Sequence, residues 1–158
     1  MLKATDFKPT DLCYTFVADD GTNYHIASSL LRKHCLEKLG QTDIFLLALR
    51  PKLAASFITK NVVHPLRVAS LRPQDLFEPV IFCSFDKITH PNGHPDAMPV
   101  DGHHRYCRLA LEGEKYIRAY ILAEKIWKDF QIEDDAFMRT YTKEELEAEP
   151  IAQKPHWK

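Results

Sequence analysis

The residues best placed to do chemistry form one short segment, Val100–Arg105 (VDGHHR). The segment lies between a short strand-like stretch and the best amphipathic helix pattern in the chain. The N–H groups in the first turn of a helix attract anions, and an arginine supplies a fork of donors that suits phosphate or carboxylate. The segment therefore predicts an anion-binding site at a helix N-terminus.

The five residues from Asp101 to Arg105 each have a predicted role. Gly102 allows the backbone to approach a phosphate closely, and we expect the N–H groups of Gly102, His103 and His104 to hold that phosphate. The side chains of His104 and Arg105 are the predicted ligand contacts, with Arg105 neutralising charge in a transition state. Asp101 is a candidate helix cap and equally a candidate base or Mg²⁺ ligand. The His103 side chain is spaced to face the core.

Arg108 stands one helical turn after His104 and three residues after Arg105. Positive charge near the first turn of a helix opposes the helix dipole, and a bound anion would relieve that cost. Arg108 is therefore interpreted either as a surface residue or as a secondary phosphate contact.

Two more histidines, His90 and His94, flank Pro-Asn-Gly in the segment before the motif. They are typical of a polar turn, but they could also join Asp101 and His104 as metal ligands. Arg72 and Gln74 are further candidates at an upstream turn.

Bulk properties narrow the class of protein. The chain has 158 residues and a formal net charge of −1, which predicts one domain and argues against general attraction to DNA or RNA. No apolar run reaches membrane-spanning length and the N-terminus has no apolar signal-peptide region. We therefore expect a cytoplasmic protein that does not contact a membrane. The four cysteines form no CxxC pair and are predicted to be reduced packing residues.

Periodicity and turn residues predict an α/β (α+β) fold, a small mixed sheet with flanking helices. A hairpin is expected over 14–27, a helix from a Ser28 or Ser29 cap to Leu39, and a strand or helix start at 44–49. Residues 62–70 are predicted to be a strand broken by Pro65, and 86–97 a turn-rich loop. Further strands are expected at 79–85, 98–100 and 116–122, with helices at 52–60, 103–112, 123–130 and in 133–148. This order predicts an N-terminal extension over 1–60, a core over 61–131 and a helical tail over 132–158.

The order strand, polar loop, strand, DGHHR helix and strand over residues 62–122 resembles the ParB/sulfiredoxin fold. Members of that fold open a helix with a G-x-x-R or G-x-H-R signature after a strand. Asp101–Arg105 is similar to the DGHHR form in ParB-like nuclease-type domains and related small-molecule kinases, and Val68–Gln74 and Pro79–Ile81 resemble the elements that precede it. The resemblance implies nucleotide phosphates at the helix N-terminus, with ATP, CTP or another nucleoside triphosphate as ligand and Mg²⁺ as the cation.

The chain also departs from that pattern. His103 stands where sulfiredoxin-like signatures place a nucleophilic cysteine, so sulfinic-acid reduction is not expected. No helix-turn-helix unit follows the core, unlike in ParB partition proteins.

Three functions fit these observations. The first is a protein that binds a nucleotide or a phosphorylated small molecule and catalyses phosphoryl transfer or hydrolysis. The second is a metal-dependent nuclease that uses His90, His94, Asp101 and His104. The third is a non-catalytic module for protein or DNA, with a vestigial pocket; the net charge does not favour DNA. The oligomeric state is left open by the sequence.

Overall fold

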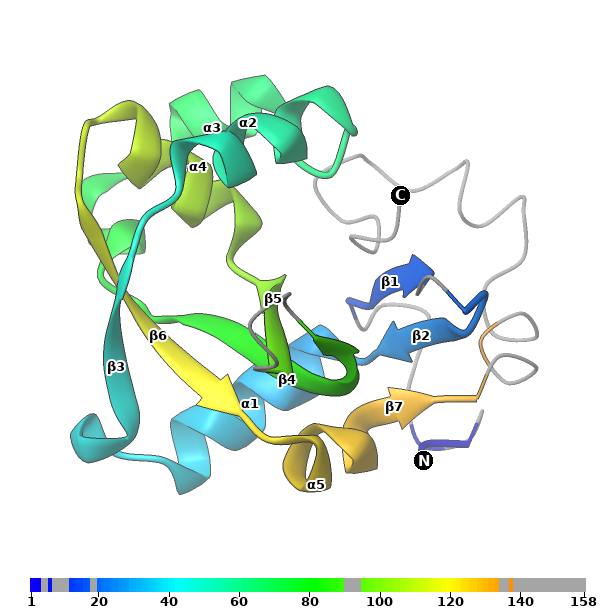
Figure 1. The fold of residues 1–158 in the computed structure, drawn as a ribbon. Helices are drawn as coiled ribbons and strands as arrows, with labels where there is room; N and C mark the ends of the chain where they lie inside the picture. The colour runs from blue at the N-terminus through cyan, green and yellow to red at the C-terminus, as the bar shows by residue number, and fades with distance from the viewer. Residues whose placement is uncertain (4–5, 7–11, 18–19, 90–94, 134–136, 138–158) are drawn as a thin grey trace.

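A computed structural model describes residues 1–3, 6, 12–17, 20–89, 95–133 and 137. It contains two small sheets with helices packed around them (Figure 1). The larger sheet has the order β3 (Ile44–Ala48), β6 (Tyr116–Leu122), β4 (Val80–Thr89) and β5 (Pro95–Asp101). Strands β4 and β6 run parallel and the other two pairs are antiparallel, which confirms a mixed sheet and an α+β architecture.

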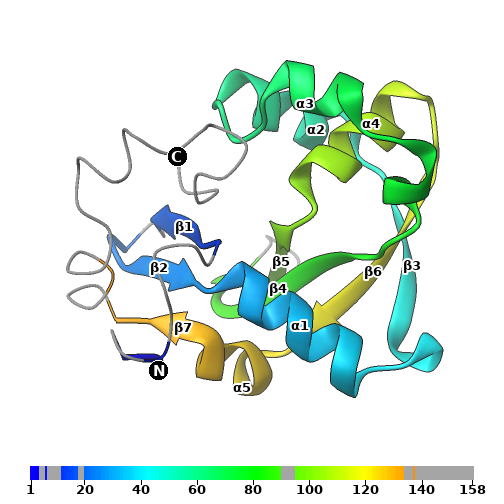
Figure 2. The same ribbon diagram turned by 180° about the vertical axis from the view of Figure 1, so that it is seen from behind.

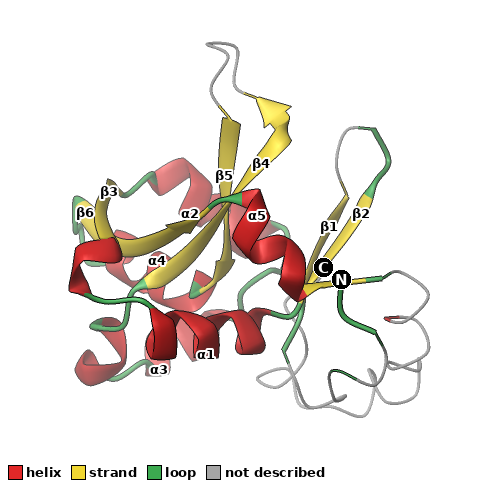
Figure 3. Cartoon of the chain, turned by 90° about the horizontal axis from the view of Figure 1, so that it is seen from below, coloured by secondary structure: helices red, strands yellow, loops and turns green. Residues whose placement is uncertain are grey.

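The smaller sheet is formed by the two ends of the described chain. It has the order β1 (Tyr14–Val17), β2 (Asn23–Ile26) and β7 (Gln131–Ile132), all antiparallel. The predicted hairpin over 14–27 is confirmed, with Gly21 in the turn at a φ of +83°. Figure 3 shows this sheet beside the larger one, while the far ends of β4 and β5 project away from the helices.

Helices cover both faces of the larger sheet, and the strand sequences alternate accordingly. Helix α1 (Ser28–Lys38) lies behind the sheet in Figure 1 and in front of it in Figure 2. On that face Ile81, Cys83 and Tyr120 join a core with Leu31 of α1.

The opposite face packs against three more helices, α2 (Pro51–Thr59), α3 (Pro65–Ser70) and α4 (His103–Leu111). Val80 and Phe82 of β4 share this second core with Ile117 of β6. The period-two pattern of the strands therefore sorts alternate residues into two cores.

The chain after β6 packs against the larger sheet. Helix α5 (Glu124–Trp127) and the 3₁₀ helix η3 (Lys128–Phe130) follow, and the indole N–H of Trp127 donates to the Ser84 carbonyl at 2.8 Å. Two further 3₁₀ helices, η1 (Gln41–Asp43) and η2 (Pro73–Leu76), precede β3 and β4. None of the described helices combines the length and apolar character needed to cross a membrane.

Three local predictions were wrong. Residues 65–70 form helix α3 rather than a strand, because Pro65 occupies the first helical turn, where its missing N–H costs nothing. In the predicted loop 86–97, the described residues 86–89 and 95–97 are strand, since β4 continues to Thr89 and β5 begins at Pro95. Neither Ser28 nor Ser29 caps α1, whose N-cap is Ala27; the Ser29 hydroxyl accepts from the Leu12 N–H instead.

The remaining predictions on residues 28–122 agree with the structure more closely. Residues 44–49, left open between strand and helix, form β3, which belongs to the same sheet as β4 and β6. Helices at 28–39, 52–60 and 103–112 and the strand at 116–122 are confirmed within a residue or two of their predicted ends. The polar helices expected in 133–148 fall almost entirely outside the described residues.

Candidate functional site: the pocket at the start of helix α4

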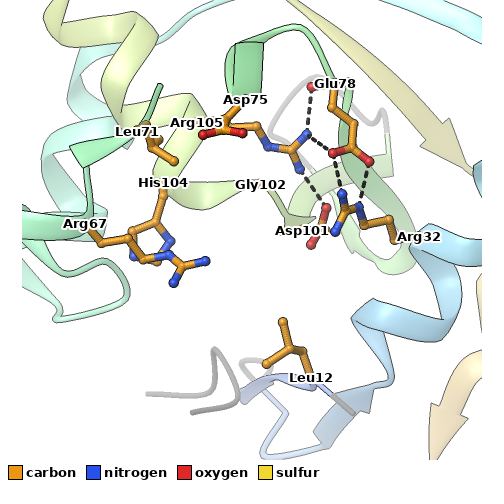
Figure 4. Close-up of a pocket in the computed structure, with 10 residues that line it drawn as sticks. All are labelled: Leu12, Arg32, Arg67, Leu71, Asp75, Glu78, Asp101, Gly102, His104 and Arg105. Atoms are coloured by element: carbon orange, nitrogen blue, oxygen red, sulfur yellow. Dashed lines mark hydrogen bonds and ion pairs between the residues drawn. The ribbon is translucent and has the colours of Figure 1, made fainter. Parts of the chain in front are cut away.

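A pocket of about 300 Å³ opens where β5 passes into α4. Its walls come from segments far apart in the sequence, which Figure 4 shows converging on one hollow. The lining residues are Leu12, Arg32, Arg67, Leu71, Asp75, Glu78, Asp101, Gly102, His104 and Arg105. The structure therefore brings Asp101, Gly102, His104 and Arg105 of the predicted site together.

Gly102 makes the turn between β5 and α4 and is the N-cap residue of α4. Its φ of +89° lies in the left-handed region that favours glycine. Space imposes a second requirement, since a Cβ here would lie 2.6 Å from Val80 Cγ1 and 2.8 Å from Arg105 Nη2. No side chain forms a capping hydrogen bond with α4, so its first turn is not closed by the usual device.

Arg105 is buried and held by the protein itself. Its Nη2 donates to Asp101 Oδ2 at 2.8 Å, and its Nη1 donates to the Glu78 carbonyl at 2.7 Å and the Pro79 carbonyl at 3.2 Å. The Glu78 carboxylate lies 3.6 Å from Nη1. We call Arg105, Asp101, Glu78 and the Pro79 carbonyl the Arg105 clamp. It fastens the end of β5 and the first turn of α4 to the segment before β4.

The Arg105 clamp also determines the role of the Asp101 side chain. Its carboxylate pairs with Arg105 across one helical turn rather than capping α4. A buried arginine between two carboxylates has much of its charge neutralised. Arg105 is thus primarily a residue that shapes the pocket wall, a role that sequence reasoning did not assign to it.

Arg32 extends the ion-pair chain from α1. Its Nε donates to Glu78 Oε1 at 2.7 Å, and a second hydrogen bond joins its Nη2 to Glu78 Oε2. The hydrogen bond to Glu78 raises the pKa of Arg32, with smaller contributions from the charges of Glu78 and Asp101. Figure 4 shows Arg105, Asp101, Glu78 and Arg32 as one continuous wall of the pocket.

His104 and Arg67 lie across the pocket from that wall (Figure 4). His104 Nε2 accepts a hydrogen bond of 3.1 Å from the backbone N–H of His64, the N-cap residue of α3. Because Nε2 is the acceptor, the ring proton of neutral His104 lies on Nδ1. His104 thereby holds the start of α3, the short helix that carries Arg67 into the pocket.

Arg108 holds the other end of α3. Its Nη1 donates to the carbonyls of Val68 at 3.0 Å, Ala69 at 2.9 Å and Leu71 at 3.4 Å, which are the free carbonyls where α3 ends. Its Nε also pairs with Glu112. Arg108 lines a different hollow, so its contribution to the pocket is to place α3.

His103 turns away from the pocket into the core. It is 1% exposed, and its ring stacks on Tyr14 at 4.9 Å and meets Phe57 edge-on at 4.9 Å. Tyr106 and Cys107, on the same side of α4, reach α2: the Tyr106 hydroxyl accepts from the Arg50 N–H at 2.9 Å, and Cys107 Sγ donates to the Ala54 carbonyl at 3.4 Å.

Of the other predicted candidates, Arg72 and Gln74 do not line the pocket. His90 and His94 lie outside the described residues. Among the residues that are described, no group of three or more His, Cys, Asp or Glu side chains is arranged to hold a metal ion. Arg72 is exposed and pairs with Asp75, and Gln74 is exposed as well.

Several lining residues carried no sequence signal. Arg32 lies on the polar side of an amphipathic helix, where an arginine is ordinarily solvated. Arg67 was hidden by the incorrect strand prediction for 62–70, since a helix was needed to turn it toward α4. Asp75 lies in the 3₁₀ helix η2 and Glu78 in the short link to β4, and no local pattern indicates that either faces the pocket.

Comparison with known proteins adds nothing to this geometry, since the chain matches no protein-family model, no curated protein and no solved structure.

Proposed function

We propose that this protein binds a nucleotide or another phosphate-bearing small molecule with its phosphates at the N-terminus of α4. The observation that carries the proposal is an uncapped helix start on a pocket. Gly102 exposes the backbone there, and no side chain caps the turn. Backbone N–H groups in a first turn attract phosphate through both hydrogen bonds and the helix dipole.

The wall formed by Arg67 and His104 supports the same ligand class. An arginine suits phosphate because its planar fork can donate two hydrogen bonds at once. Arg67 enters the pocket from α3, which His104 and Arg108 fix at its two ends. We therefore assign the direct cationic contact to Arg67, and to Arg105 the positioning of the helix start.

The charge balance of the pocket favours a ligand that brings its own cation. Arg32, Arg67 and Arg105 line it together with Asp75, Glu78 and Asp101. A phosphate-bound Mg²⁺ needs only one or two carboxylates from the protein. The volume of the pocket lies at the lower end for ligand sites, and it matches the phosphate part of a nucleotide rather than the whole molecule.

The DGHHR motif at the start of α4, with β5 before it and β6 after it, resembles the ParB/sulfiredoxin pattern, and this resemblance supports a nucleoside triphosphate as the ligand. Hydrolysis or phosphoryl transfer is the reaction class we propose for the site. Asp101 or His104 would act as the base, and the donors at the start of α4 would stabilise charge on the phosphates.

Calorimetric titration with ATP, CTP and ADP, each with and without Mg²⁺, tests binding directly. We expect binding that strengthens with Mg²⁺ and a loss of about ten- to a hundredfold for Arg67→Ala, the usual cost of removing one charged hydrogen-bonding partner. Lys60→Ala is the control, because Lys60 is an exposed cationic residue away from the pocket. Phosphate release by the same samples then tests turnover.

Two results would overturn the proposal. One is the absence of heat with every nucleotide; the other is equal affinity for the wild type and Arg67→Ala. The metal-dependent nuclease remains the alternative, and plasmid nicking that needs His90 and His94 but not Arg67 would support it instead.

A further inference from the structure

Strand β3 forms one edge of the larger sheet and lacks the features that normally prevent an edge from pairing with another chain. It pairs with β6 on one side, and in all three ribbon views it lies at the margin of the molecule (Figures 1 to 3). Its sequence, IFLLA, contains no charge, no proline and no glycine. Phe45 is 53% exposed and Leu46 is 66% exposed, and Tyr116 of β6, which pairs with Ala48, is 57% exposed.

The opposite edge of the same sheet shows what protection looks like. Strand β5 contains Pro95 and Pro99, which have no backbone N–H to donate to a neighbouring strand. Its pairing with β4 is also interrupted by register shifts. Prolines, charges and bulges are the features that natural sheets use to prevent edge-to-edge pairing. Only β5 has them.

The hydrogen bonds of β3 define which groups face outward. The Leu49 N–H donates to the Lys115 carbonyl at 2.9 Å, one step beyond the Ala48–Tyr116 pair. Hydrogen-bonded pairs alternate along an antiparallel ladder. Phe45 and Leu47 therefore bond inward to β6, and the backbone groups of Ile44, Leu46 and Ala48 point to the open side.

We propose that this edge binds a second copy of the same chain, β3 against β3, antiparallel, with Leu46 on the two-fold axis. The three outward residues are symmetric about Leu46, so Leu46 pairs with itself and Ile44 pairs with Ala48 of the other copy. Three such pairs form about six backbone hydrogen bonds. The two four-stranded sheets become one continuous sheet.

Side chains and charges fit the same register. Phe45 faces Leu47 of the other copy on one side of the sheet, and Leu46 faces Leu46 on the other, which are favourable apolar cross-strand pairs. Exposed Asp43 precedes each strand and exposed Arg50 follows it. Antiparallel pairing brings the acidic end of one strand beside the basic end of its partner. A two-fold interface of this kind is self-complementary, as closed homodimers require.

Light scattering coupled to size exclusion, over a series of concentrations of the full chain, tests the assembly. We expect twice the mass of one chain for the wild type and a single-chain mass for Leu46→Lys, which places two like charges opposite each other. Leu66→Lys is the control, since Leu66 is a comparably exposed leucine on α3. A monomeric wild type at every concentration, or a dimer that Leu46→Lys leaves intact, would overturn the proposal.

Crosslinking tests the register independently of variant stability. Opposed residues in an antiparallel pair are within the range that a disulfide can span. Leu46→Cys should give a covalent dimer on mild oxidation, whereas Phe45→Cys alone, which faces Leu47 of the other copy, should not. The four native cysteines are buried and provide a low background. Equal crosslinking of both variants, or of neither, would contradict the Leu46-centred register.

Discussion

The start of α4 and the free edge of β3 are two boundaries of one sheet, and they use their side chains in opposite ways. At the start of α4, the conspicuous polar residues are already engaged with the protein: Arg105 with Asp101 and Glu78, and His104 with the backbone of His64. At β3 the residues are apolar and unremarkable in the sequence, yet Leu46 is largely exposed.

Under both proposals, reactive residue types do not by themselves mark a contact surface. In the Arg105 clamp, the guanidinium of Arg105 donates its hydrogen bonds to Asp101 and to the carbonyls of Glu78 and Pro79, which hold the pocket together. The ligand would meet the helix backbone and Arg67, whereas a second chain would meet the bare backbone of β3. Substitutions in the clamp should therefore change stability first, and substitutions at β3 should change association first.

The largest expected effect is at Gly102. Gly102→Ala should lower the free energy of unfolding by about 2–5 kcal/mol, which combines a left-handed backbone cost with overpacking against Val80. Gly113→Ala is the matched control, because its φ of +79° is similar but a Cβ there meets nothing within 4 Å. Denaturant unfolding of both variants measures the difference. Equal losses would mean that close packing at Gly102 contributes nothing.

Arg105 comes next. Arg105→Ala leaves Asp101 and the Glu78 carbonyl without their partner in a nearly buried place, and should lower the free energy of unfolding by about 3 kcal/mol. The exposed Arg72–Asp75 pair supplies the comparison, and Arg72→Ala should leave stability almost unchanged. Urea denaturation curves for the two variants give the answer. An Arg105→Ala protein as stable as wild type would mean that the clamp does not hold the pocket.

Strong periodicity made much of this fold predictable. The alternation of YIRAYIL predicts β6 at its observed bounds, and the amphipathic pattern after Gly102 predicts α4. Both patterns are long enough to report the face that is buried. The spacing of His103 ahead of Tyr106 and Cys107 likewise indicates the core position that the structure gives it.

Short elements were harder to predict from the sequence. The β-branched residues of 62–70 favour a strand, but the six-residue helix α3 is held at both ends by His104 and Arg108, which no local pattern encodes. The pocket lining depends on such long-range contacts. Arg32 and Glu78, for example, are 46 residues apart in the chain and meet only when α1 covers the sheet.

A smaller effect is the pH dependence of stability that Cys35 of α1 should cause. Burial, with a contribution from the charge of Asp101, raises the pKa of the Cys35 thiol from 9.0 to about 12. The folded state therefore keeps a proton that the unfolded state loses above pH 9, so this stability is complete below pH 9 and is lost as pH rises toward 12. Cys35 alone should remove about 1.4 kcal/mol for each pH unit in that window.

Unfolding measured between pH 8 and about 10 for wild type and Cys35→Ala checks this slope. The variant should lose stability less steeply than wild type, because one buried thiol no longer resists deprotonation. Leu46→Lys should retain the wild-type slope below pH 10, since the Leu46 side chain is 66% exposed and is not part of the core that surrounds Cys35. Identical slopes for wild type and Cys35→Ala would show that Cys35 ionises equally well in both states.

Leu46→Lys should have the smallest effect on the stability of a single chain. Leu46→Lys, measured at a protein concentration low enough to keep the chains apart, should change the free energy of unfolding by no more than about 0.5 kcal/mol, because the side chain already faces solvent. Ile117→Ala, at a buried position on the neighbouring strand β6, should cost about 2–5 kcal/mol. If Leu46→Lys instead approaches the cost of Ile117→Ala, then β3 is stabilised within one chain and its exposed face is not free to pair. A small stability change together with lost association would mean that the edge serves assembly while the Arg105 clamp serves the fold.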